Sequence, residues 1–210
     1  MTNTQRMTVR RLARREEGTC RDMYRAAGRD GEWAGAMTPD TFAAAGEWWG
    51  LFCDGAPVLC AALADADRSV LQIRALCGAQ RTLGLPPAGR WRYLLPPAAA
   101  GGAERGAARF LDAVAARANA PLVAALPVKT GGALLAAYFA AGFYLWAMRP
   151  LASLRPHYIF LRGGVQTGRQ CRIIRETDTL ALSRALEEGA AGTGVWYAQG
   201  QRCVCLAPKG

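Results

Sequence analysis

The sequence predicts an α/β fold: a mixed, mostly antiparallel sheet flanked by helices, with a small β-α-β-β extension at its C-terminal end. Composition is the first reason, because 210 residues with 51% hydrophobic and 20% charged side chains can bury one sizeable core. The second reason is that strand-like and helix-like patterns follow one another along the chain. We therefore expect a main body, 1–162, and an extension, 163–210, packed on it.

The first part of the chain predicts a strand, two helices and a hairpin. Residues 7–12 alternate apolar and basic side chains, which is typical of a half-exposed strand. An apolar stripe with offsets of three and four predicts a helix over 16–27, and Thr38-Pro39-Asp40 predicts the start of a second, short helix. Asp54-Gly55 between two apolar runs predicts a hairpin turn.

The middle of the chain predicts alternating strands and helices. The segment 69–83 fits a helix or a strand plus loop, and both interpretations stay open. The other expected elements are strands at 91–95, 121–126, 143–148 and 157–161 and helices at 104–118 and 132–141. The run at 121–126 is apolar throughout, which suits a strand buried on both faces.

The last 45 or so residues are few for an independent domain. They predict a strand at 171–175, a helix at 178–188 capped by Thr177 or Asp178, and a hairpin at 195–206 that turns near Gln199-Gly200. We expect this extension to pack on the main body, to extend its sheet or to contact a partner, a second copy in a homodimer included.

Charge and cysteine usage narrow the function classes. The net charge is +10, and all but two of the 26 basic residues are arginines, so either a plain solvated surface or an anion-binding role is open. No uninterrupted apolar stretch approaches the roughly 20 residues that span a bilayer, and the start lacks a secretory apolar region, so we expect no membrane partner and a cytoplasmic location. Seven cysteines without a C-x-x-C motif predict reduced thiols.

Tyr138 closes an apolar helix, a small-residue turn follows, and Gly142-Phe143 leads into an aromatic strand. This spacing resembles the L-Y-x-x-x-G-F motif of the GCN5-related N-acetyltransferase (GNAT) superfamily, and the order of elements over 7–162 resembles its fold. In the longer pattern N-x-x-A-x-x-L-Y-x-x-x-G-F, Gly131 replaces the asparagine. The resemblance implies an N-acyltransferase that moves an acetyl group from acetyl-CoA to a small-molecule or peptide amine by direct attack.

In this family a strand ends in a bulge, and a loop R/Q-x-x-G-x-G/A before the next helix holds the coenzyme A pyrophosphate through its amides. The best register puts 106–108 on G-x-G/A and Ala103 where arginine or glutamine is expected. The resemblance thus assigns acetyl-CoA binding to the strand end and the loop: Leu94, Leu95, Gly101, Gly102, Arg105, Gly106, Ala107 and Ala108. The alternative is a flexible Ala/Gly linker that enters an ordinary helix.

The resemblance assigns Tyr138 as the general acid that protonates the departing thiolate. The alternative is a core tyrosine bonded to a backbone carbonyl. Because the attacking amine must be neutral, a general base is also expected; Glu47 and Asp54 are candidates by position, with solvated loop carboxylates as the alternative. His157 is the single histidine and cannot form a metal site alone.

Two other function classes stay open. The missing arginine or glutamine and the missing asparagine favour a catalytically silent GNAT-like module whose extension makes a protein contact. Nucleic-acid binding through the arginines lacks a recognisable motif, so we do not expect a nucleic-acid partner.

Overall fold

The computed structural model describes residues 6–29, 45–65, 91–99, 106–128, 131–150, 156–163, 167–169 and 171–210. Its strands are β1 (Met7–Arg11), β2 (Ala45–Cys53), β3 (Ala56–Asp65), β4 (Arg92–Leu94), β5 (Ala98–Ala99), β6 (Leu122–Pro127), β7 (Tyr144–Pro150), β8 (Pro156–Arg162), β9 (Arg172–Arg175), β10 (Ala190–Ala198) and β11 (Gln201–Pro208). Its helices are α1 (Glu17–Arg29), α5 (Ala107–Arg117), α6 (Gly131–Ala140) and α7 (Thr179–Glu187), with a 3-10 turn at Arg14–Glu16. No helix in these ranges is long and apolar enough to cross a bilayer. The predicted short helix after Thr38 and the undecided segment 69–83 lie outside the described residues.

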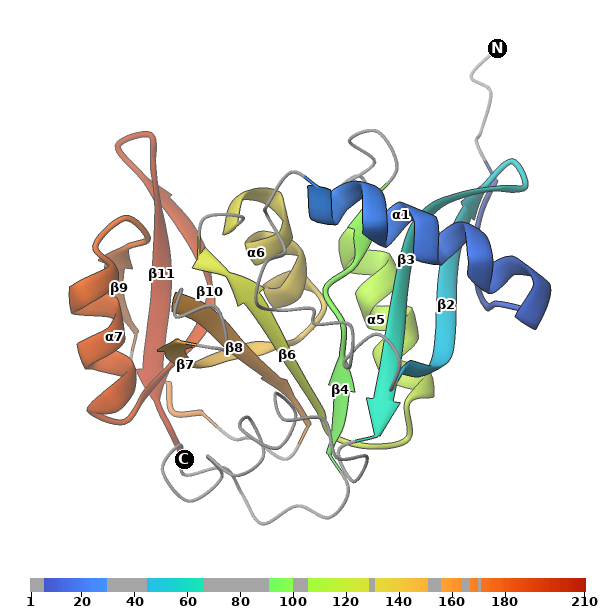
Figure 1. Cartoon of the computed structure of the whole chain (residues 1–210). Coiled ribbons are helices and arrows are strands. Elements are labelled where there is room, and N and C mark those ends of the chain that lie inside the picture. The colour runs from blue at the N-terminus through green and yellow to red at the C-terminus, as the bar shows by residue number, and fades with distance from the viewer. Residues whose placement is uncertain are drawn as a thin grey trace.

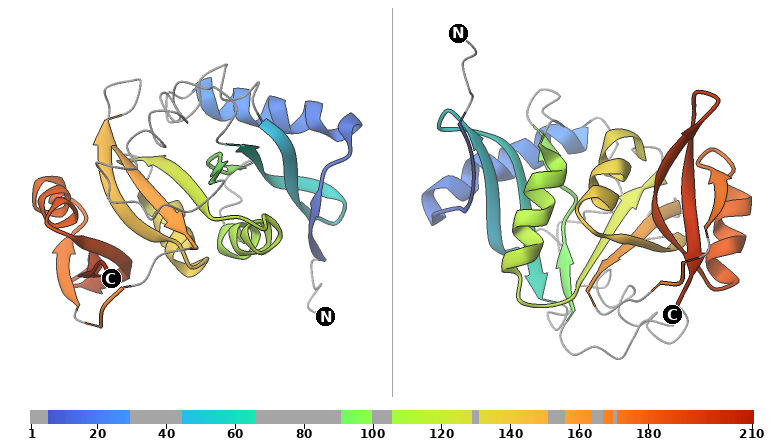
Figure 2. Two further views of the ribbon diagram at one scale, coloured as in Figure 1. Left: turned by 90° about the horizontal axis from the view of Figure 1, so that it is seen from below. Right: turned by 180° about the vertical axis from the view of Figure 1, so that it is seen from behind.

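The described strands form one sheet in the order β1-β2-β3-β4-β6-β8-β7-β10-β11-β9, with β5 paired to β3. Neighbouring strands are antiparallel, except that β4 and β6 are parallel. Figure 2 shows α1 on one face of the sheet and α5 and α6 on the other. The predicted mixed, mostly antiparallel sheet flanked by helices is confirmed.

Two hydrophobic clusters fill the two sides of the sheet. The first lies against α5, α6 and α7 and includes Phe110, Tyr138 and Phe160. The second lies beneath α1 and includes Tyr24 and Tyr93. Strand β6 contributes to both clusters because every one of its residues is buried, as its uninterrupted apolar run predicts.

Both predicted hairpin turns are present. The β2–β3 turn has positive φ at Asp54 (49°) and Gly55 (87°), and the β10–β11 turn has positive φ at Gln199 (51°) and Gly200 (73°). Two successive residues with positive φ are the signature of a type I′ turn, whose twist matches that of the flanking strands. Asp-Gly satisfies this requirement directly, which is why the sequence located the first hairpin.

The extension has the predicted β-α-β-β order and continues the sheet beyond β7. Its contact with β7 is close at Gly192, where an added Cβ would lie 2.7 Å from the Leu145 Cβ and 3.3 Å from the Phe139 Cζ. Ile174 and Leu182 of the extension lie in the same hydrophobic cluster as α6. The extension therefore packs on the main body; the division between 1–162 and 163–210 stays a prediction.

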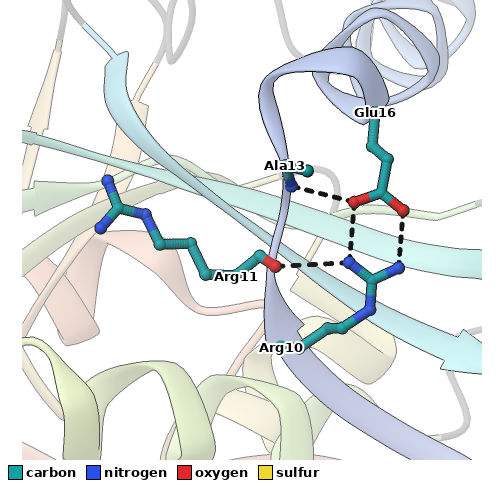
Figure 3. A network of polar contacts seen from close by, with 4 residues as sticks. All are labelled: Arg10, Arg11, Ala13 and Glu16. Carbon is teal, nitrogen blue, oxygen red and sulfur yellow. Dashed lines mark hydrogen bonds and ion pairs between the residues drawn. The ribbon is translucent and has the colours of Figure 1, made fainter.

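A charged clamp fixes the junction between β1 and α1 (Figure 3). The Arg10 guanidinium donates to both carboxylate oxygens of Glu16, at 2.7 and 2.6 Å, and the Ala13 amide donates to the same carboxylate at 2.9 Å. The bond from Arg10 and then the bond from Ala13 lower the pKa of Glu16 to about 2. Arg10 also lies 3.9 Å above the Phe52 ring centre, so the 3-10 turn that leads into α1 is held against β2.

Candidate functional site

The sheet opens where its parallel pair of strands ends. β4 and β6 are paired from Arg92 and Leu122 to Leu94 and Ala124. Among the described residues, 125–127 of β6 then pair with β8 alone. The two strands diverge from that point, as Figure 1 shows. Ligands of α/β proteins commonly bind beyond the carboxyl ends of parallel strands, so this opening is the candidate site.

Two prolines explain why β4 leaves β6. Pro96 and Pro97 have no backbone N–H and cannot donate to a strand ladder. The Leu95 amide donates to the Ala62 carbonyl of β3 at 2.9 Å, and the chain then pairs with β3 again as β5. The strand therefore bends toward β3 and away from β6.

The two leucines predicted to bind the donor can contact a ligand at this opening through their backbone groups and not through their side chains. Leu94 and Leu95 are both fully buried. Leu94 packs on the α5 side of the sheet, and Leu95 packs on the α1 side. Neither side chain is left to line a cavity, and what remains available at the bend is the main chain.

Helix α5 begins at the same end of the sheet. It connects two parallel strands, so it runs antiparallel to them and starts where β4 finishes (Figure 1). Gly106 is its N-cap, with φ 101°, and makes no side-chain cap; an added Cβ would lie 3.1 Å from the Leu51 Cδ2. The first turn carries no acidic residue and has the exposed Arg109.

The start of α5 can therefore hold an anion, because its first amides have no intrahelical acceptor and the helix dipole is positive there. Of the predicted anion cradle, the structure brings Gly106, Ala107 and Ala108 to this helix start. Gly101, Gly102 and Arg105 lie outside the described residues.

The Tyr-x-x-x-Gly-Phe motif forms the C-terminal cap of α6. Gly142 has φ 77°, and its amide donates to the Phe139 carbonyl at 2.9 Å, while the Phe143 amide donates to the Tyr138 carbonyl at 3.0 Å. These two bonds define a Schellman motif. The Phe143 ring meets the Tyr138 ring edge-on at 5.1 Å, which supplies the hydrophobic contact that accompanies such a cap. The spacing of the motif thus has a structural cause that is independent of chemistry.

Gly142→Ala is expected to lower the free energy of unfolding by about 1–2 kcal/mol, because a left-handed backbone strains any residue with a Cβ. An added Cβ would meet only the Arg162 Nε at 3.9 Å, so the loss would come from the backbone and not from a clash. Urea unfolding measures it. Gly18→Ala, in open space on α1, is the control and should leave stability unchanged or raised. If Gly142→Ala left the free energy of unfolding unchanged, the left-handed cap at this position would be contradicted.

The hydroxyl of Tyr138 is the unusual group at the opening. The side chain is fully buried, and its hydroxyl has no hydrogen-bond partner in the described part of the chain. The ring stacks at 4.7 Å on Phe160, which pairs with Ala124, the last β6 residue paired to β4. Burial raises the pKa of Tyr138, and the nearby Tyr93 of β4 raises it further, so the hydroxyl stays protonated at neutral pH.

The carboxylate of Glu47 is engaged by an indole of its own strand and by a guanidinium of β4. The Glu47 carboxylate accepts from the Trp49 indole at 3.0 Å and pairs with Arg92, the first residue of β4, at 2.9 Å. Arg92 also donates to the Ala118 carbonyl, which follows the last residue of α5. The carboxylate therefore joins β2 and β4 to the end of α5, away from its N-terminal turn.

The other ionisable candidates are Asp54 of the β2–β3 turn and His157 of β8. Asp54 sits in the β2–β3 turn and accepts from the Arg6 amide at 3.3 Å. His157 is fully buried and pairs in the ladder with Pro127 and Arg149. Neither residue is assigned a catalytic role.

Two further phenols lie near the opening. Tyr24 of α1 and Tyr93 of β4 are buried on the α1 side of the sheet. Burial raises the pKa of each, and for Tyr24 the nearby Cys60 and Tyr138 groups add to the rise. No local pattern marks these residues, because Tyr24 falls on an ordinary apolar stripe and Tyr93 inside an ordinary strand; only the fold brings them near Tyr138.

Among solved structures, the chain is similar to an N-acyl amino acid synthase from uncultured soil microbes, with a TM-score of 0.52 and 13% identity over 76% of this chain and 91% of that chain. The sheet is mixed and mostly antiparallel, as expected from the sequence, and among the described strands its parallel pair opens beside the start of α5. The chain has the GNAT fold.

Two more solved structures with similar architecture are acetyltransferases. An aminoglycoside N(6')acetyltransferase from Legionella pneumophila has a TM-score of 0.49 and 9% identity over 77% of this chain and 94% of that chain. An aminoglycoside acetyltransferase in complex with coenzyme A and kanamycin has a TM-score of 0.48 and 11% identity over 75% of this chain and 94% of that chain. No protein-family model and no curated protein matches the sequence. At these identities the GNAT likeness concerns the fold, and function has to be argued from the site.

Proposed function

We propose that this GNAT-fold chain is an N-acyltransferase that takes an acyl group, acetyl in the simplest case, from a coenzyme A thioester and transfers it to an amine. The observation that carries the proposal is the buried Tyr138 hydroxyl, which has no partner among the described residues and whose ring stacks on Phe160, beside the last β6 residue paired to β4. A buried hydroxyl without a partner is costly, and a ligand atom at the opening would remove that cost.

The donor would be held by main-chain groups. Its pyrophosphate fits the first amides of α5 after Gly106, with Gly101, Gly102 and Arg105 of the preceding loop as proposed additional contacts. Its pantetheine arm fits the opening between the bend after Leu94 and residues 125–127 of β6. This position would bring the thioester sulfur toward Tyr138.

The reaction proceeds in one displacement. The amine nitrogen attacks the thioester carbonyl carbon, a C–N bond forms and the C–S bond breaks. The departing thiolate takes the proton of the Tyr138 hydroxyl, and the phenolate regains a proton released by the amine through water. No covalent enzyme intermediate forms. We do not propose Glu47 as the base, because its carboxylate is engaged by Trp49 and Arg92.

Calorimetry and a thiol-release assay test the proposal. The chain should bind acetyl-CoA, and free thiol should accumulate when an amine is added; kanamycin, a polyamine and an amino acid are suitable first acceptors because each carries a primary amine. Binding without thiol release for any amine would favour the silent GNAT-like module. A folded sample that does not bind acetyl-CoA at millimolar concentration would refute the donor assignment.

Arg109→Glu should separate stability from donor binding. The change puts a negative charge at the positive end of α5, so the free energy of unfolding should rise by about 0.3–1 kcal/mol. The same charge repels the pyrophosphate, so the Kd for acetyl-CoA should rise about tenfold, which corresponds to ~1.4 kcal/mol. Chemical denaturation and calorimetry measure the two effects.

Arg117→Glu is the matched control for Arg109→Glu. Both residues are exposed on α5 and both changes alter the net charge equally, but Arg117 lies in the last turn, where the dipole favours a positive charge. Arg117→Glu should lower stability and leave the Kd within about twofold. Equal effects of the two variants on the Kd would mean that only the overall charge matters.

A further inference from the structure

We propose that Tyr24 of α1 is a positioning residue for the donor site: its hydroxyl holds the Pro96 carbonyl and so keeps β4 bent away from β6. The Tyr24 hydroxyl donates to the Pro96 carbonyl at 2.6 Å and lies 3.3 Å from the Cys60 carbonyl of β3. This role in donor binding rests on the proposed function, whereas the role in shaping the bend does not.

The bend needs a partner from outside the sheet. Pro96 and Pro97 have no N–H and interrupt the β3–β4 ladder, so no strand amide there can donate to the facing carbonyls of β3. A buried carbonyl without a donor is unfavourable, and the phenol of Tyr24 donates to the Pro96 carbonyl. The hydroxyl also reaches Cys60, the β3 residue that pairs with β5 just beyond the prolines.

Helix α1 can hold this hydroxyl in place. The 3-10 turn that leads into it is fixed by the Arg10–Glu16 clamp, and Tyr24 is only 1% exposed. The Tyr24 ring meets Trp48 of β2 edge-on, with ring centres 5.8 Å apart. A rigid phenol that spans from α1 to the bend therefore couples the position of this helix to the width of the opening.

The position of Tyr24 relative to Tyr138 supports the assignment. The two residues belong to clusters on opposite faces of the sheet, yet the Tyr138 phenol contributes to the raised pKa of Tyr24. The two phenols therefore act on each other electrostatically although they lie on opposite faces of the sheet. The Tyr138 hydroxyl has no hydrogen-bond partner among the described residues, whereas the Tyr24 hydroxyl donates to Pro96, so the two phenols have different roles.

Tyr24→Phe tests the inference through donor binding. It keeps the ring and removes the hydroxyl, so the Kd for acetyl-CoA should rise about tenfold, whereas kcat at saturating donor should change less than about threefold. The control is Tyr158→Phe, which removes a buried hydroxyl that has no hydrogen-bond partner among the described residues and whose pKa is affected by Glu176 and Arg202 of the extension. It should change neither quantity.

Amide hydrogen exchange tests the bend without any ligand. The Leu95 amide, which donates to Ala62, and the amides of β5 should exchange about tenfold faster in Tyr24→Phe than in Tyr158→Phe, while those of β8 stay unchanged. Unchanged exchange and unchanged Kd would overturn the inference. Faster exchange throughout the sheet would also overturn it, because the hydroxyl would then act on global stability. If the unmodified chain does not bind acetyl-CoA, the proposed function fails and the exchange result still decides the role of Tyr24.

Discussion

Tyr138→Phe is expected to lower kcat for acyl transfer about 100-fold or more and to leave the Kd for acetyl-CoA within about twofold. The change removes only the proton that the departing thiolate would take. The ring contacts with Phe143 and Phe160 would remain, so the α6 cap and the opening should keep their shape. Steady-state kinetics with saturating donor and calorimetry measure the two quantities.

The matched control is again Tyr158→Phe. Both hydroxyls are buried in the same cluster and neither has a hydrogen-bond partner among the described residues, but Glu176 and Arg202 of the extension affect the pKa of Tyr158, whereas Tyr93 of β4 affects that of Tyr138. Tyr158→Phe should leave kcat unchanged. If Tyr138→Phe weakened donor binding as much as turnover, or changed neither, Tyr138 would be a packing residue and the catalytic assignment would be wrong.

Alkaline pH is expected to unfold the chain steeply. Burial raises the pKa of four phenols above the ordinary value of about 10: Tyr24, Tyr93, Tyr138 and Tyr158. A raised pKa in the folded state gives stability that is fully present below the unfolded pKa and is lost as the pH rises above it. Each phenol should therefore remove about 1.4 kcal/mol per pH unit above about pH 10.

Urea unfolding at a series of pH values measures this loss, and tyrosinate absorbance follows ionisation. Tyr138→Phe should reduce the loss of unfolding free energy per pH unit by the contribution of one phenol. One buried group would then no longer ionise on unfolding. Ionisation of all tyrosines near pH 10 without a loss of stability would show that these side chains are open to water.

Local patterns predicted most of the elements because their causes are local. Asp54-Gly55 can adopt two positive φ values, and Gly142 can end a helix in the left-handed region, so a turn and a cap follow from short segments. Asp178 is likewise the N-cap of α7, where its carboxylate accepts from the Ala181 amide at 3.0 Å. Such contacts span few residues, and the sequence shows both partners.

The site depended on distant contacts that no local pattern contains. Glu47 stands near a hairpin, as a base could, but its partner Arg92 lies 45 residues away. Tyr24 stands on an apolar stripe, but its acceptor Pro96 lies 72 residues away. Pro96-Pro97 predicted the end of a strand, whereas the return of the chain to β3, which opens the sheet, follows from pairing with a strand earlier in the chain.

A crystal structure with acetyl-CoA bound tests the central claim most directly. We predict the pyrophosphate at the amides that begin α5, the pantetheine arm between the bend after Leu94 and the end of β6, and the thioester sulfur within hydrogen-bond reach of the Tyr138 hydroxyl. A donor bound elsewhere on the folded chain, or a sulfur remote from that hydroxyl, would contradict the assignment.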